Sequence, residues 1–172
     1  FYSVLNTELP AGRLQQIVAQ LDPPVIVTSR ENLPRAREIF PEEKLCCFED
    51  LALHTEDARR LEKIQARAID TDPLYVNFTS GSTGVPKGIV VSSRSVLDFI
   101  GCFTELFGIT QDDVIANQAP FDFDVSVKDI YSAMKAGATL AVVPRRLFSV
   151  PTQLIDFLCE KKATTLIWAV SA

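Results

Sequence analysis

The sequence predicts an α/β fold, with a mainly parallel sheet and flanking helices. Two observations predict it. Short, continuously apolar segments alternate with longer segments whose apolar residues recur at i, i+3, i+4 and i+7, the spacing of one helix face. Buried apolar strands separated by amphipathic helices are typical of parallel sheets that carry helices on their faces.

The first part of the chain is predicted to contain three helices and two strands. The helices cover residues 10–21, 31–39 and 55–67, and the strands cover residues 25–27 and 45–48. The first helix carries an apolar face made of Leu14, Ile17, Val18 and Leu21. Its opening Pro10 suits a first turn, because the N–H that proline lacks has no partner there. The stretch at 55–67 is rich in charge and is expected to be either a solvated helix or a partly ordered connection.

The second part alternates strands with three further helices. The strands are expected at 74–78, 89–91, 114–116, 138–143 and 164–168. Ser92 or Ser93 can cap a helix that ends at Gly108. Ser126 is predicted to cap the next helix, which ends at Gly137, and Pro151 opens the last one. The apolar faces of these three helices contain Val96, Ile100, Phe103 and Phe107, then Ile130, Tyr131 and Met134, then Leu154, Ile155 and Leu158.

Composition narrows the class of protein. The 172 residues are 47% hydrophobic and 23% charged, as in ordinary globular chains. The net charge is −5 and the basic residues are scattered, which argues against a nucleic-acid partner. The sequence shows no membrane-length apolar run and no signal peptide, so a cytoplasmic location without a membrane partner is expected. Both ends are apolar and abrupt, so residues 1–172 are expected to form a single partial domain of a larger protein.

The cysteines and the single histidine give no metal-site pattern. Cys46, Cys47, Cys102 and Cys159 form no C-x-x-C motif, and His54 has no potential ligand at metal-site spacing. We therefore expect reduced, buried thiols and no protein-bound metal within the chain.

One segment carries recognisable chemistry. Between the strands at 74–78 and 89–91 lie four hydroxyl side chains, several glycines and a lysine. Glycines let successive backbone N–H groups converge on an anion, hydroxyls add neutral donors, and lysine supplies a mobile charge. This composition suits a polyphosphate. It is not the common P-loop, because Lys87 precedes Gly88 and a strand rather than Ser or Thr and a helix.

The order of these residues resembles a known motif. Thr-Ser-Gly-Ser-Thr-Gly-Val-Pro-Lys-Gly at 79–88 is similar to the motif of the adenylate-forming (AMP-binding) superfamily, which includes acyl-CoA synthetases, luciferases and adenylation domains of nonribosomal peptide synthetases. Upstream, Leu9-Pro10 and Arg13 resemble the Asp-Pro-x-x-Pro-x-x-Arg-Leu segment of amino-acid-activating members, although Asn6 and Thr7 replace its first two residues. Residues 123–127 and 137–140 resemble the Phe-Asp-x-Ser-Val and Gly-Ala-x-Leu elements, and 123–131 is most similar to D-alanine–carrier protein ligases.

The resemblance implies ATP-dependent activation of a carboxylate, with Mg²⁺ sharing the phosphate charge. The acyl-adenylate formed with release of pyrophosphate would pass to the phosphopantetheine thiol of a carrier protein, or to coenzyme A. By the family pattern, the ATP phosphates would be held by Thr79, Ser80, Gly81, Ser82, Thr83, Gly84 and Lys87. The family's later motifs and its C-terminal small domain lie outside these residues. We therefore identify an N-terminal large-domain fragment without a complete catalytic set, expected to be inactive alone.

Asp124 bears on the class of substrate. In amino-acid-activating members the aspartate of Phe-Asp-x-Ser pairs with the substrate ammonium, and Val125 and Lys128 would then line the pocket. From the residues alone, Asp124 could equally cap the helix that follows. Lys128 is unexpected beside a small apolar substrate side chain, and Ser93 stands where family members commonly have a histidine.

Three interpretations remain open at this point. The first is an amino-acid-activating adenylation enzyme. The second is an acyl- or aryl-CoA ligase, which would have no use for an acidic residue at 124. The third is a non-catalytic α/β fragment that self-associates through apolar surfaces left uncovered.

Overall fold

The computed structural model describes residues 1–79 and 85–168. These residues form two compact units, which we call unit 1 and unit 2. Unit 1 comprises Phe1–Val4, Asp70–Asn77 and Val90–Ala172, and unit 2 comprises Leu5–Ile69 and Phe78–Ile89. The strand pair β3 (Pro73–Thr79) and β4 (Lys87–Ser92) contributes residues to both units. Each unit is described separately.

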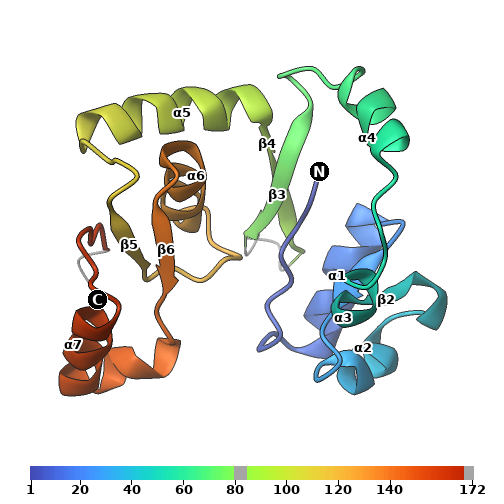
Figure 1. Cartoon of the computed structure of the whole chain (residues 1–172). Helices are drawn as coiled ribbons and strands as arrows, with labels where there is room; N and C mark the ends of the chain where they lie inside the picture. Colours follow the sequence, from blue (N-terminus) through green and yellow to red (C-terminus); the bar gives the residue numbers. More distant parts are fainter. Residues whose placement is uncertain (80–84, 169–172) are drawn as a thin grey trace. The chain divides into compact units, whose positions relative to one another are not determined.

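Unit 2 contains a short parallel strand pair accompanied by helices (Figure 1). In chain order its elements are α1 (Ala11–Leu21), β1 (Ile26–Thr28), α2 (Leu33–Ile39), the 3₁₀ turn η1 (Glu42–Lys44), β2 (Leu45–Cys47), α3 (Phe48–Leu51) and α4 (Ala58–Gln65). In the strand pair, Ile26 lies opposite Leu45 and Thr28 lies opposite Cys47. Each predicted element of this region is therefore present, with ends shifted by up to three residues.

The apolar spacing of α1 explains its place in unit 2. Leu14, Ile17 and Val18 are buried, as their positions on one helix face predict. The helix ends at Asp22, whose backbone is left-handed (φ 39°). The Asp22 carboxylate forms an ion pair with the Lys44 ammonium at 2.6 Å. By contrast, no residue of α4 is buried, so the solvated helix is the alternative observed for this segment.

Unit 1 contains the second parallel strand pair. After β4 come α5 (Ser93–Leu106), β5 (Val114–Asn117), α6 (Ser126–Ala136), β6 (Thr139–Val142), the 3₁₀ turn η2 (Arg145–Ser149) and α7 (Pro151–Glu160). β5 and β6 pair in parallel, from Val114 opposite Thr139 to Asn117 opposite Val142. The connection between them is α6, as a parallel crossover requires. Among the described residues, no helix is long and apolar enough to cross a lipid bilayer.

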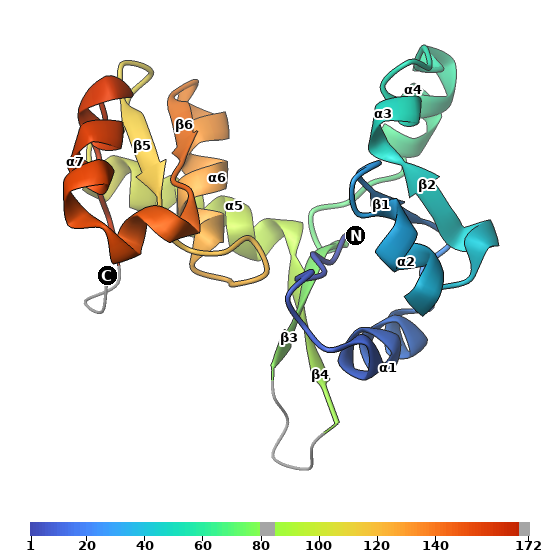
Figure 2. The ribbon, with the colours of Figure 1, turned by 90° about the horizontal axis from the view of Figure 1, so that it is seen from below.

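Helices cover both faces of the β5–β6 pair. On one face, Ile109 and Ile115 pack with Ala133 of α6. On the other, Ala116 and Val143 pack with Leu147 and with apolar residues of α7. Figure 2 shows α6 and α7 on opposite sides of the two strands. The predicted α/β class, with parallel strands and flanking helices, is confirmed.

Four details differ from the sequence-based expectations. Ser126 does not cap α6, because Val125 already has helical backbone angles and the Ser126 hydroxyl donates to the Phe123 carbonyl at 2.7 Å. On the predicted apolar faces, Met134, Phe107 and Ile155 are 72%, 51% and 60% exposed rather than buried. The expected strand at 164–168 is reduced to one isolated bridge, between Thr165 and Ile115. All four thiols are free, but Cys102 and Cys159 are exposed, so only part of the expectation of buried thiols holds.

Asp113 stabilises the junction between β5 and residues 164–165. One carboxylate oxygen accepts from the backbone N–H of Thr110 at 2.8 Å, and the other accepts from the hydroxyls of Thr164 and Thr165, each at 2.7 Å. The Thr110 N–H, followed by the two threonine hydroxyls, lowers the pKa of Asp113 from 3.8 to about 2. The folded structure therefore stabilises the ionised Asp113 carboxylate.

Asp113→Ala is expected to lower the free energy of unfolding at pH 7 by about 1–3 kcal/mol, because the Thr110 N–H and the hydroxyls of Thr110, Thr164 and Thr165 lose a charged acceptor. The stabilisation should be complete above the ordinary pKa of 3.8 and should vanish as the pH falls through about 2, where the folded carboxylate is protonated. Thermal or urea unfolding at several pH values measures the difference. The exposed neighbour Asp112→Ala is the matched control, and equal losses in both variants would contradict this role for Asp113.

Candidate functional site

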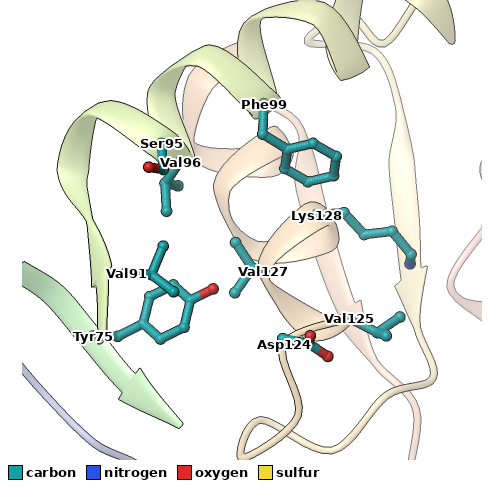
Figure 3. Close-up of a pocket in the computed structure, with 9 residues that line it drawn as sticks. All are labelled: Tyr75, Val91, Ser95, Val96, Phe99, Asp124, Val125, Val127 and Lys128. Atoms are coloured by element: carbon teal, nitrogen blue, oxygen red, sulfur yellow. The ribbon is translucent and has the colours of Figure 1, made fainter. Parts of the chain in front are cut away.

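A pocket of about 380 Å³ lies in unit 1, between β3, β4, α5 and the start of α6 (Figure 3). Most of its lining is apolar, with Val91, Val96, Phe99 and Val127 among the lining residues. The polar and remaining lining residues are Tyr75, Ser95, Asp124, Val125 and Lys128. The structure therefore brings together the three residues that the sequence predicts for substrate binding. An apolar cavity with a few polar groups is the usual form of a small-molecule site.

Asp124 lies in the loop before α6, with its carboxylate exposed at the pocket. Its backbone carbonyl accepts from Val127 N–H at 3.0 Å, which is the local turn that starts the helix. Within residues 1–79 and 85–168, the Asp124 carboxylate makes no hydrogen bond and no ion pair. The alternative role as a side-chain helix cap is therefore not the one adopted in the described structure. An accessible carboxylate beside apolar walls is suited to a cationic group of a ligand.

Tyr75 projects from β3 into the same pocket. Burial raises the pKa of Tyr75, and the negative charge of Asp124 raises it further. Tyr75 also belongs to the buried cluster with Val96 and Val127 that holds β3, α5 and α6 together. The Tyr75 side chain is thus both part of the pocket and part of the packing that shapes it.

The Lys128 side chain lines part of the pocket, but its ammonium is paired with Asp129. The Lys128 ammonium lies 2.6 Å from Asp129 Oδ1, and its side chain is 13% exposed. Asn117, the last residue of β5, donates from Nδ2 to Asp129 Oδ2 at 2.9 Å. Figure 3 shows the ammonium pointing away from Tyr75 and Val91. Both oxygens of Asp129 are therefore engaged, one of them by Lys128.

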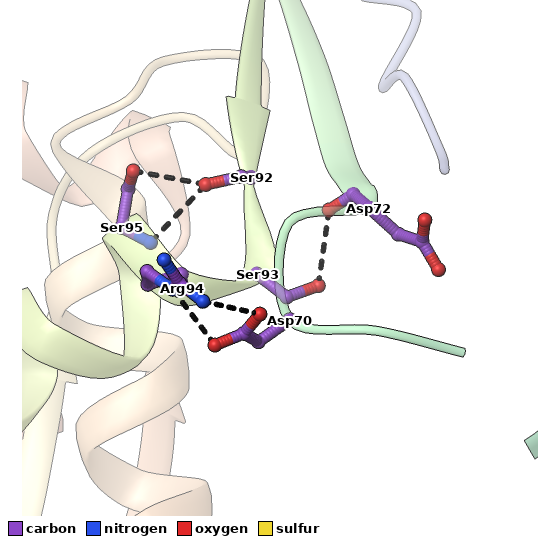
Figure 4. A network of polar contacts seen from close by, with 6 residues as sticks. All are labelled: Asp70, Asp72, Ser92, Ser93, Arg94 and Ser95. Atoms are coloured by element: carbon purple, nitrogen blue, oxygen red, sulfur yellow. Dashed lines mark hydrogen bonds and ion pairs between the residues drawn. The ribbon is translucent and has the colours of Figure 1, made fainter.

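The start of α5 is fixed by a polar network (Figure 4). Ser92 is the helix cap, and its hydroxyl accepts from Ser95 N–H at 3.3 Å. Arg94 binds Asp70 through two bonds of 2.7 and 2.8 Å, and this pairing lowers the pKa of the Asp70 carboxyl. The hydroxyl of Ser93 donates to the Asp72 carbonyl at 3.4 Å. These contacts set the position of Ser95 at the pocket.

The second predicted group of site residues belongs to unit 2, where β3 ends and β4 begins. Thr79 is the last residue of β3 and Lys87 is the first residue of β4, and both are exposed. In the described part of the chain the Lys87 ammonium makes no ion pair. Ser80, Gly81, Ser82, Thr83 and Gly84 lie outside the described residues. Thr79 and Lys87, which flank that segment in the sequence, are thus both accessible to an anion.

Helix α1 contacts both flanks of this segment. Arg13 Nη2 donates to the Thr79 carbonyl at 3.0 Å, and Gln20 Nε2 donates to the Pro86 carbonyl at 2.9 Å. Gln20 follows Arg13 by seven positions, which is about two helical turns. The Pro86 side chain is fully buried. One rigid helix therefore holds the backbone next to Thr79 and next to Lys87.

Several functional neighbours could not be identified from the sequence. Tyr75 was noted only as part of a strand, and Asp129 only as part of the motif at 123–131. Asn117 was not noted, because its contact with Asp129 joins a strand to a helix. Gln20 gave no signal, whereas Arg13 was noted only as part of a motif.

Among the residues that the structure describes, no group of three or more histidine, cysteine, aspartate or glutamate side chains could hold a metal ion.

Comparison with known proteins gives a consistent result. The AMP-binding enzyme family matches residues 1–172. An L-proline--[L-prolyl-carrier protein] ligase of Pseudomonas fluorescens is 41% identical over 102 residues, 59% of this chain and 20% of that protein. A D-alanine--D-alanyl carrier protein ligase of Staphylococcus aureus is 30% identical over 159 residues, 91% of this chain and 31% of that protein. The crystal structure of IdnL1 superposes with a TM-score of 0.75 at 28% identity, covering 95% of this chain and 32% of that one.

The chain thus spans a third or less of the length of these relatives. The family match extends over the whole of the chain, and the α/β arrangement agrees with that of a solved relative. The motif at 79–88 and the Phe-Asp-Val-Ser-Val element at 123–127 fall within the matched region. The chain belongs to the family of AMP-binding enzymes.

Proposed function

We propose that the full-length protein uses ATP to activate an amino acid as an aminoacyl-adenylate and then transfers the aminoacyl group to a thiol. The observation that carries this proposal is the accessible Asp124 carboxylate in a mainly apolar pocket. A carboxylate there forms a charge-assisted hydrogen bond with the ammonium of an amino acid. An acid without an amino group has no such donor and cannot form this bond.

The proposed reaction has two steps. In the first, a carboxylate oxygen of the amino acid attacks the α-phosphorus of ATP, the bond to the bridging oxygen breaks, and pyrophosphate leaves. In the second, a thiolate attacks the acyl carbon, a thioester forms, and AMP leaves. Positioning of the reactants and neutralisation of phosphate charge are the main contributions that the protein makes to such steps.

The ATP phosphates are proposed to be bound by the residues around the end of β3 and the start of β4. Lys87 would offer its ammonium to a β- or γ-phosphate oxygen, and Thr79 would offer a hydroxyl donor. Ser80, Gly81, Ser82, Thr83 and Gly84 are assigned to the phosphates from the motif alone. Mg²⁺ would arrive with ATP, because it keeps several waters and is bound largely through substrate phosphates in such sites.

The amino acid is proposed to be bound in the pocket of unit 1, by Asp124, Val125 and Lys128. Asp124 would hold the ammonium, and Val125 and the Lys128 stem would form part of the wall around the amino-acid side chain. The thiol acceptor is proposed to be the phosphopantetheine arm of a carrier protein. Support comes from the names of two relatives, both of which are ligases of carrier proteins.

We further propose that residues 1–172 are part of one larger adenylation domain and do not turn over alone. The basis is the family match along all of these residues, in a chain that spans a third or less of its relatives. Detectable adenylate formation by the isolated 172 residues would contradict this second proposal.

ATP–pyrophosphate exchange with the full-length protein tests the proposed function. The panel should pair each amino acid with the same acid lacking its amino group, for example leucine with 4-methylpentanoate. Exchange driven by amino acids is expected. Exchange only with acids that lack the amino group would instead indicate an acyl- or aryl-CoA ligase, and no exchange with any acid would contradict adenylation itself.

The contacts of α1 give a separate prediction. Gln20→Met keeps the side-chain length but removes the donor to the Pro86 carbonyl, and Arg13→Met removes the donor to the Thr79 carbonyl. Because both bonds fix backbone next to the proposed phosphate residues, each variant should raise the KM for ATP about three- to tenfold, which is about 1 kcal/mol. The KM for the amino acid should not change.

Gln16→Met is the matched control, because Gln16 lies exposed on the same helix. Exchange assays with varied ATP measure the effect. An equal rise in KM for both substrates would indicate a general loss of structure and contradict a specific role for these two contacts.

A further inference from the structure

We propose that Asp129 holds the Lys128 ammonium away from the pocket, so that the pocket accepts amino acids with uncharged side chains and discriminates against acidic ones. This inference rests on the proposed function and concerns the side-chain end of the same site. It assigns Asp129 as a positioning residue and Lys128 as a wall residue rather than a charged recognition residue.

The Asp129 carboxylate is almost completely buried, with 1% of the residue exposed. One of its oxygens receives the Lys128 ammonium at 2.6 Å and the other receives Asn117 Nδ2 at 2.9 Å. Asn117 is itself 3% exposed, and it is fixed at the end of β5 by the strand pair with β6. The carboxylate that binds Lys128 is therefore anchored from a second element and cannot follow the lysine.

Lys128 is consequently not free to turn toward a ligand. Withdrawing its ammonium would leave a buried carboxylate with an amide donor but no counter-charge, which is strongly unfavourable. To draw Lys128 into the pocket, a substrate carboxylate would have to attract its ammonium more strongly than Asp129 does. The pocket is more exposed than Asp129, so the attraction between the substrate carboxylate and the lysine is weaker there. The Lys128–Asp129 pair is thus expected to survive ligand binding.

With Lys128 neutralised, Asp124 dominates the charge facing the pocket. The remaining lining is formed mainly by Val91, Val96, Phe99 and Val127. An acidic side chain would meet these apolar groups without a partner for its charge, whereas an apolar side chain would gain from burial. The substrate class favoured by this arrangement is an amino acid with an uncharged, mainly apolar side chain.

The test measures kcat/KM for ATP–pyrophosphate exchange in the full-length protein, with alanine, valine, leucine, proline and phenylalanine against aspartate and glutamate. The best neutral amino acid should exceed both acidic ones at least tenfold. Asp129→Asn removes the charge that restrains Lys128, and it should lower this ratio about tenfold. Asp156→Asn, an exposed aspartate on α7, is the matched control and should leave the ratio unchanged.

The double variant Lys128→Met, Asp129→Asn removes both charges without leaving a buried ion, and it should keep the preference for neutral amino acids. A wild-type preference for aspartate or glutamate that disappears in the double variant would overturn the inference, because Lys128 would then be the recognition residue. An unchanged ratio in Asp129→Asn would overturn the role of Asp129. Exchange with no amino acid at all would instead contradict the proposed function, so the two failures are distinguishable.

Discussion

Lys87→Ala is expected to lower kcat/KM for ATP–pyrophosphate exchange about 10²- to 10³-fold in the full-length protein. The physical reason is the loss of a mobile positive charge where negative charge develops on the leaving pyrophosphate. Removal of one donor from an oxyanion hole, which also stabilises developing negative charge, costs about 2.7–4 kcal/mol. Lys87 is exposed at the start of β4, so its removal leaves no buried partner unpaired. Stability should therefore change little.

The matched control for this prediction is Lys63→Ala, which removes an exposed lysine from α4. Its exchange activity should stay within about twofold of the wild type, because surface substitutions away from a site have small effects. If Lys87→Ala retained full activity with an unchanged KM for ATP, the assignment of this segment to the phosphates would be wrong.

Asp124→Asn is expected to reduce kcat/KM for the preferred amino acid about 100-fold, or ~2.7 kcal/mol, because the substrate ammonium loses its counter-charge. The amide keeps the size of the side chain, so the pocket should stay intact. Activity with the analogue that lacks the amino group should be unchanged. Exchange assays with the amino acid and its analogue in parallel separate the charge effect from a general loss of activity.

Asp122→Asn serves as the control, because Asp122 is the competing aspartate two residues earlier in the same loop. Asp124, and not Asp122, lines the pocket in the structure. A change of less than about threefold is expected for Asp122→Asn. A larger loss in Asp122→Asn than in Asp124→Asn would contradict the assignment of the ammonium site.

The sequence predicted most elements because their apolar residues follow a regular spacing. Helix α1 illustrates this, since Leu14, Ile17 and Val18 are the buried residues that its pattern predicts. The start of α5 was predicted to within one residue. The choice between Ser92 and Ser93 as its cap needed the bond from Ser95 N–H to the Ser92 hydroxyl.

Helix α6 shows where spacing alone fails. Its buried side includes Asp129 and Ser132, which a search for apolar residues does not count, and Met134 on the predicted face is exposed. The burial of Asp129 is possible because it has partners in Asn117 and Lys128. Such partners come from the tertiary structure, so periodicity cannot reveal them.

The candidate site was predictable as a set of residues but not as an arrangement. Asp124, Val125 and Lys128 were expected together from one short motif, and they do line one pocket. The direction of the Lys128 ammonium depends on Asp129 next to it and on Asn117, which comes from another element. The lysine that was unexpected beside an apolar pocket is thus found paired with Asp129.

The most direct measurement is a crystal structure of the full-length protein with a non-hydrolysable analogue of the adenylate of its preferred amino acid. We expect the analogue's ammonium within about 3 Å of the Asp124 carboxylate, the distance of a charge-assisted hydrogen bond. We also expect the Lys128 ammonium to remain on Asp129. An analogue whose amino group lies away from Asp124, or a Lys128 ammonium bound to the ligand, would contradict the proposed roles of these residues.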